Sequence, residues 1–92
     1  MYFMRSTTSI AAMAKGVANG HRVAMLFLLY RQPGIDLDMI SHRLEIGYKN
    51  AAEHTRKMLH GGLIKKEYEG SHVLHWLTPR GKRLASFLAR LK

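Results

Sequence analysis

The sequence predicts one α+β domain that is mostly α, with a three-helix core, a two-stranded β-hairpin and a further helix at each end. Apolar residues recur at helical spacing through the first two thirds of the chain. After Gly61-Gly62 the pattern changes to short β-prone segments, and a helical stripe returns after Thr78-Pro79. A chain of 92 residues has room for one modest core, so residues 1–92 are expected to form a single domain.

The N-terminal part, residues 1–20, is predicted to be an arm followed by a helix. Hydroxyl side chains at 6–9 can cap a helix, and apolar residues then recur at helical spacing through 10–17. Asn19-Gly20 is expected to end this helix.

The middle of the chain is predicted to hold the core helices. Segment 21–32 is apolar nearly all round, which predicts a helix that is covered on most sides. A Pro-Gly pair then interrupts the chain, and Asp36 stands at an N-cap position before a short helix. A tight turn at 45–47 leads to a further helix at 48–60, which has one apolar and one polar face.

Segments 63–69 and 72–77 flank Gly70-Ser71, a pattern typical of a β-hairpin. Trp76 is expected to share a strand face with His72 and to pack in the core rather than stack on a base.

The last helix is predicted over 79–92. Thr78 is expected to cap it, with Pro79 at its first position, where a missing N–H does no harm.

Helix, three-residue turn, helix and hairpin in this order describe a winged helix-turn-helix, whose core would span 21–78. The 48–60 helix would enter the major groove of duplex DNA, and the hairpin, the wing, would lie on the backbone or in the minor groove.

Charge supports a nucleic-acid partner. The net charge is +9, and the half from Tyr48 onward has ten basic and three acidic side chains. Charge alone does not choose among DNA, RNA and an anionic membrane surface, so the order of the elements decides in favour of double-stranded DNA.

The predicted DNA contacts lie on the polar face of the 48–60 helix and on the wing. Asn50 is the best base reader, because its amide can pair with adenine through two hydrogen bonds. Lys49 and Arg56 can donate hydrogen bonds to guanine or to a phosphate. Glu53 can accept a hydrogen bond from cytosine, or it can repel phosphate. Tyr48 can donate to a phosphate or pack as an apolar residue under the turn. The alternative for the charged residues is an ordinary solvated helix face. The predicted set is Tyr48, Lys49, Asn50, Glu53, His54, Arg56, Lys57, Lys65, Lys66, Ser71 and His72.

The residues also resemble a known family. The stretch 52–64, Ala-Glu-His-Thr-Arg-Lys-Met-Leu-His-Gly-Gly-Leu-Ile, resembles the Ser-Arg-His-Leu and Gly-Leu-Val segment of ArsR-type regulators and is similar to MarR-type repressors. The segment 76–81, Trp-Leu-Thr-Pro-Arg-Gly, resembles the Leu-Thr-x-x-Gly that ends their wing. The resemblance implies a transcriptional regulator. Ala52 and Thr55 depart from the usual Ser and Leu.

The resemblance also implies a homodimer built from the terminal helices. The sequence gives these segments more apolar surface than a small core can cover, although packing onto their own domain is the alternative. The predicted interface is Tyr2, Phe3, Ile10, Met13, Val17, Leu84, Phe87, Leu88 and Leu91.

No cofactor, metal site, catalytic residue or membrane span is expected. The chain has no cysteine, and its six histidines lack a metal-binding spacing with a neighbouring carboxylate. No nucleophile motif or phosphate-cradling loop suggests an enzyme. Absence of a secretory signal favours a cytoplasmic protein, nucleoid-associated if prokaryotic. Non-specific architectural DNA binding, or a winged helix that binds protein or RNA, are the alternative functions.

Overall fold

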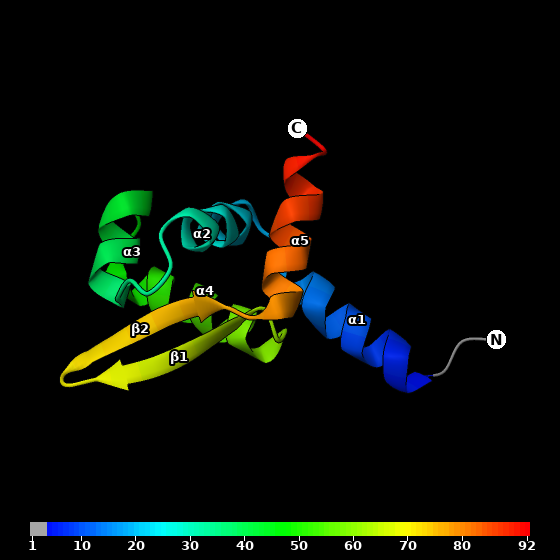
Figure 1. Ribbon diagram of the computed structural model, residues 1–92, viewed down its shortest axis with the longest axis horizontal. Helices are drawn as coiled ribbons and strands as arrows, with labels where there is room; N and C mark the ends of the chain where they lie inside the picture. Colours follow the sequence, from blue (N-terminus) through cyan, green and yellow to red (C-terminus); the bar gives the residue numbers. More distant parts are fainter. Residues whose placement is uncertain (1–3) are drawn as a thin grey trace.

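The computed structural model describes the backbone of residues 4–92 and the side chains of residues 6–92. Tyr2 and Phe3 of the predicted dimer interface lie outside the described residues. Within residues 4–92, five helices and one antiparallel hairpin confirm the predicted architecture (Figure 1). The elements are α1 (Met4–Val17), α2 (Gly20–Arg31), α3 (Leu37–Leu44), α4 (Tyr48–His60), β1 (Ile64–Glu69), β2 (His72–Leu77) and α5 (Pro79–Ala89).

Helix α2 is the central core helix, as its apolar composition predicts. Met25, Leu26 and Leu29 on this helix are buried, and they belong to one cluster with Ile40 of α3 and Met58 of α4. α3 and α4 therefore have a common support, and their mutual angle is set by core packing. Figure 1 shows α1 projecting away from this body towards the N-terminus.

The predicted cap of α1 is wrong. The helix begins at Met4, so the hydroxyl residues at 6–9 lie inside it. α1 ends at Val17, directly before Asn19-Gly20, as predicted. Asn19 is in addition the N-cap of α2, and its Oδ1 accepts from the backbone N–H groups of His21 and Arg22 at 2.8 and 3.4 Å.

The turn between α3 and α4 follows the prediction at 45–47. Asp36 caps α3 by accepting from the N–H of Met39 at 2.9 Å. Glu45 ends α3 in the left-handed region, with φ at 53°. The hydroxyl of Ser41 donates to the carbonyl of Ile46 at 2.6 Å. These bonds fix the direction in which α4 leaves the turn.

The wing pairs Ile64 with Leu77 at its base and Glu69 with His72 next to its tip. On β2 the buried residues are His75 and Leu77, so the expectation that the face of Trp76 turns to the core is wrong. Leu77 fixes the register, and alternation then turns His75 inward. The half-buried Trp76 packs over Gly34, where a Cβ would lie 2.8 Å from the indole ring.

Thr78 links the wing to α5 and confirms the predicted cap. Its Oγ1 accepts from the N–H of Gly81 at 3.0 Å and donates to the carbonyl of Gly62 at 2.7 Å. A Cβ on Gly81 would collide with the carbonyl oxygen of Leu63, so only glycine permits this contact. Pro79 occupies the first turn as predicted.

Candidate nucleic-acid interface

Helix α4 has one face in the core and one in solvent. Ala51, Thr55 and Met58 are buried, and the hydroxyl of Thr55 donates to the carbonyl of Ala52 at 2.8 Å within the helix. Thr55 therefore helps to hold α4 on the core, at the position where the sequence departs from the expected leucine. The outer face of α4 is defined as the exposed polar side chains between Tyr48 and His60. It consists of Lys49, Asn50, Glu53, Arg56 and Lys57.

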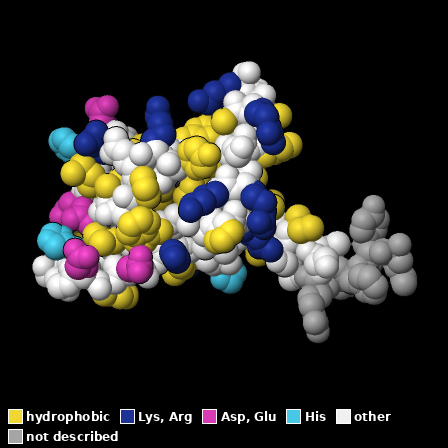
Figure 2. Space-filling view, viewed as in Figure 1, with side chains coloured by type: hydrophobic (Ala, Val, Ile, Leu, Met, Phe, Trp, Pro, Cys, Tyr) yellow, Lys and Arg dark blue, Asp and Glu magenta, His cyan; other side chains and the backbone are white. Residues whose placement is uncertain are grey.

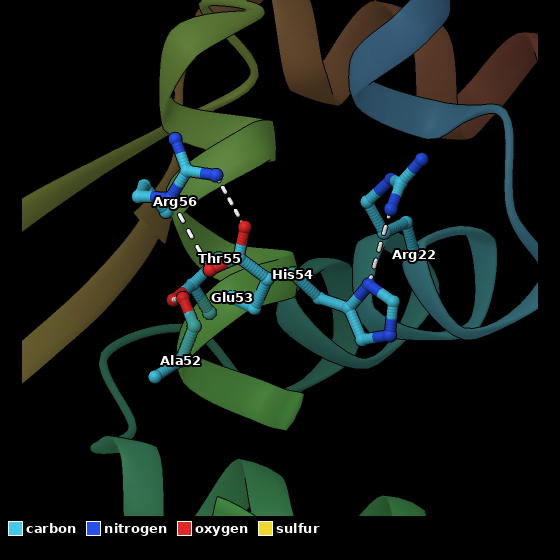
Figure 3. A network of polar contacts seen from close by, with 6 residues as sticks. All are labelled: Arg22, Ala52, Glu53, His54, Thr55 and Arg56. Carbon is cyan, nitrogen blue, oxygen red and sulfur yellow. Dashed lines mark hydrogen bonds and ion pairs between the residues drawn. The ribbon is translucent and has the colours of Figure 1, made fainter. Parts of the chain in front are cut away.

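Two members of the outer face are tied together. Arg56 donates to the carboxylate of Glu53 one turn earlier, in the network drawn in Figure 3. Hydrogen bonding to Arg56 lowers the pKa of Glu53 below its ordinary value. Glu53 thus stays ionised and orients the guanidinium, whereas Lys49, Asn50 and Lys57 have no such bond to a side chain among residues 6–92.

His54 is turned towards α2 rather than outward. Its Nδ1 lies 3.1 Å from Nη1 of Arg22 (Figure 3), and its ring centroid lies 5.5 Å from that of His21. Burial and, next, the charge of Arg22 lower the pKa of His54. A DNA contact by His54 would therefore have to compete with Arg22.

The sequence reasoning did not single out Arg22. It is buried, with 7% of its surface exposed, and its Nη2 donates to the carbonyl of Lys15 in α1 at 3.1 Å. The guanidinium thereby connects α1, α2 and α4. The available signal was the position of Arg22 directly before the apolar run 23–30, which indicates either a snorkelling side chain or a buried polar junction.

On the wing, the predicted basic contacts lie towards its base. Lys65 is exposed and opposite Trp76, while the half-buried Lys66 is opposite His75. At the other end, Ser71 is exposed at the tip, and His72 pairs with Asp36, with Nδ1 3.1 Å from Oδ2.

The wing tip is acidic, which the sequence reasoning missed. Glu67 and Glu69 are exposed on β1 beside the turn, together with Tyr68. In the view of Figure 2, acidic side chains gather at the α3 and wing-tip end, whereas most Lys and Arg lie towards α5. Carboxylates oppose a close approach to phosphate, so the base of the wing is better suited than its tip to contact a DNA backbone.

The predicted dimer surface divides into two groups. Met13, Val17, Leu84 and Leu88 are partly buried and pack against the core of their own chain. Ile10, Phe87 and Leu91 remain 56%, 52% and 66% exposed. They lie on α1, on α5 and just beyond its end, and the two helices are joined by a hydrogen bond of 3.1 Å from Arg80 to the hydroxyl of Ser9.

Within residues 4–92 no three His, Cys, Asp or Glu side chains are grouped so that they could hold a metal ion. None of the helices in the same range is long and apolar enough to cross a membrane.

The fold, with α4 facing outward next to a hairpin, defines a winged helix-turn-helix domain. The structure is similar to HlyU from Vibrio cholerae N16961, with a TM-score of 0.85 and 22% identity over 97% of each chain. It is also similar to PagR, a transcriptional repressor of Bacillus anthracis, with a TM-score of 0.83 and 20% identity over 94% of this chain and 99% of PagR.

A third similar structure is the homodimeric winged helix-turn-helix DNA-binding domain of Mb0332 from Mycobacterium bovis, a possible ArsR-family regulator. It has a TM-score of 0.82 and 18% identity over 99% of this chain and 86% of that domain. No family model matches the sequence, and a comparison with curated proteins finds no match. At these identities the likeness establishes the winged-helix fold that the sequence predicted.

Proposed function

We propose that this protein is a DNA-binding transcriptional regulator that acts as a homodimer, with α4 in the major groove. The observation that supports this most strongly is the outer face of α4: Lys49, Asn50, Glu53, Arg56 and Lys57 all lie in solvent on a helix whose opposite face is anchored in the core. An amide and three cations on one rigid helix face match the hydrogen-bonding edges of bases and the flanking phosphates.

Within this proposal, residues divide by role. Asn50 reads a base, because its amide can both donate and accept. Lys49 and Lys57 hold phosphates, and Arg56, oriented by Glu53, reads guanine or holds phosphate. Tyr48 is exposed at the start of α4, in reach of a backbone phosphate.

The wing contributes through the end that adjoins the core. Lys65 contacts the DNA backbone there, while the negative charges of Glu67 and Glu69 repel DNA phosphates from the tip. Ser71 and His72 remain proposed contacts, His72 only when it leaves Asp36.

Dimerisation follows from the exposed apolar side chains of Ile10, Phe87 and Leu91. A two-fold axis that brings α1 and α5 of two copies together would remove this surface from water. Two α4 helices about 34 Å apart would then meet successive major grooves. Mb0332, similar in fold, is described as homodimeric.

The test is selection of bound sequences from a random duplex pool. A palindromic consensus with half-sites about one helical turn apart is the expected result, with affinity that falls by orders of magnitude as salt rises. If selected and random duplexes bind equally, the protein is an architectural DNA-binding protein. If no duplex binds at low salt, the outer face of α4 serves another partner and the proposal is wrong.

A further inference from the structure

A pocket of about 390 Å³ lies between α1 and the C-terminal half of α4. Small residues of α1 and of the following linker form part of its wall, and basic side chains from α1, α2 and α4 form the rest. The lining residues are Ala12, Lys15, Gly16, Ala18, Arg22, Arg56, Lys57 and His60. No acidic side chain is among them, and Glu53, one turn from Arg56, is already paired with it.

Arg22 gives this pocket an unbalanced charge. Its guanidinium is buried, and its bonds go to the uncharged Lys15 carbonyl and to Nδ1 of His54. Its Nε has no hydrogen-bond partner within the part of the chain that the structure describes. Of the two ion pairs in the described part of the chain, neither includes Arg22. A guanidinium is a permanent cation, so its charge has to be met by neighbouring groups or by a ligand.

A buried cation without a counter-charge is costly, and proteins normally supply a carboxylate. The final turn of α1 offers only the partial negative charge of its carbonyl groups. The chain thus places a permanent positive charge at the wall of a pocket and leaves the compensating anion to come from outside.

We propose that this pocket binds a small organic anion, with a phosphate or carboxylate group near Arg22 and Lys15 and an apolar body against Ala12, Gly16 and Ala18. The volume lies at the lower end of the range of small-molecule sites. The pocket is also lined by methyl groups and by the aliphatic parts of lysine and arginine side chains. These apolar surfaces favour a ligand with an apolar part over a bare inorganic ion.

The site also touches α4, through Arg56, Lys57 and His60. Occupation neutralises Arg56 and Lys57, two cations of the outer face, and competes with DNA phosphate for them. This second step, regulation of DNA affinity by the anion, rests on the proposed function, whereas anion binding itself does not.

The test uses the full chain without DNA and three probes: phenyl phosphate, inorganic phosphate and the uncharged benzyl alcohol. Binding is followed by NMR through the side-chain Nε–H signal of Arg22 and by calorimetry. Phenyl phosphate is expected to bind at least about tenfold more tightly than either of the others, a difference of about 1.4 kcal/mol. Equal binding of benzyl alcohol, or no change at the Arg22 signal, overturns the proposal.

Variants separate this pocket from general attraction to a basic protein. Lys15→Gln, at the exposed rim, is expected to weaken phenyl phosphate binding about three- to tenfold, while Lys82→Gln, exposed on α5, leaves it unchanged. Arg22→Met removes the buried charge and is expected to abolish binding. Because this variant can also disturb the fold, the Lys15 and Lys82 pair decides. Equal losses from these two substitutions overturn the proposal.

A final arm distinguishes a free anion from a DNA phosphate as the occupant. If phenyl phosphate binds the DNA-free protein and lowers its affinity for duplex, the proposal stands. If no free anion binds but Lys15→Gln weakens duplex binding, the pocket holds the DNA backbone and the proposal is wrong. Should the protein bind no DNA, phenyl phosphate binding still tests the pocket.

Discussion

Gly16 and Gly61 meet where α1 crosses the end of α4. A Cβ on Gly61 would lie 2.9 Å from the carbonyl oxygen of Ala12 and 3.3 Å from the Cα of Gly16. A Cβ on Gly16 would in turn lie 3.3 Å from the carbonyl oxygen of Lys57. The absence of two side chains thus lets α1 lie directly against α4, and Gly16 also lines the pocket.

Substituting Gly61→Ala is expected to destabilise the protein by about 1–3 kcal/mol, because backbone atoms that cannot rotate away must shift to admit the methyl group. Its φ of −76° is open to alanine, so the effect is steric rather than conformational. Chemical denaturation measures the loss. Gly20→Ala is the matched control: nothing lies within 4 Å of its Cβ position, and alanine at this first residue of α2 should raise stability by about 0.4–1 kcal/mol because it restricts the unfolded chain. Equal effects of the two substitutions would contradict the close crossing.

Stability should fall in mild acid. Burial is the main cause that lowers the pKa of both His54 and His75 from the ordinary 6.5. The folded state therefore holds both imidazoles neutral, while the unfolded chain takes up protons as the pH falls through 6.5. The free energy of unfolding is constant well above this value and declines below it.

Urea denaturation at about pH 7.5 and about pH 5.5 measures this decline. Nδ1 of His75 donates to the carbonyl of Ile35 at 3.1 Å, a bond that the amide of His75→Asn can replace because its nitrogen stands at the same distance along the side chain. This variant should depend less on pH than the wild type. A wild type equally stable at both pH values would show that neither imidazole is held neutral.

The acidic wing tip predicts that removing its charges will raise the affinity for DNA. Replacing Glu67 and Glu69 by glutamine removes two negative charges next to the proposed DNA backbone, so affinity for duplex should rise about two- to tenfold at low salt. Lys65→Gln on the same strand should lower it. Fluorescence anisotropy measures both, and if neither substitution changes affinity, the wing lies away from DNA.

The exposed apolar residues predict that dimerisation depends on Phe87. Phe87→Glu would place a charge in the proposed interface and should convert a dimer into a monomer of 10.5 kDa, seen by light scattering after gel filtration. Tyr68→Glu makes the same kind of substitution at an exposed aromatic residue of the wing and should leave the mass of the dimer unchanged. A wild-type monomer at high concentration would refute the dimer.

The elements of this fold could be predicted from the sequence because local signals agree with the packing. Asp36 and Thr78 are caps, and the 21–32 segment is apolar nearly all round. The cap of α1 was mistaken because several hydroxyl residues stand near its start, and local preference does not say which of them a helix uses.

The candidate site was only partly predictable. The outer face of α4 follows from helical periodicity, whereas the turn of His54 towards Arg22 depends on how α2 and α4 pack. The inward face of β2 was missed because alternation alone allows either face, and the tertiary contact of Leu77 selects one.

The central claim is that the outer face of α4 reads DNA, and the most direct test is the affinity of Asn50→Ala for the selected duplex and for a random one. Loss of a two-bonded base contact should weaken the selected complex by about 1–3 kcal/mol and leave the random one unchanged. Arg31→Ala, an exposed cation at the end of α2, serves as control and should affect both duplexes little. If Asn50→Ala binds the selected duplex as tightly as the wild type does, α4 does not read it through this residue and the account is contradicted.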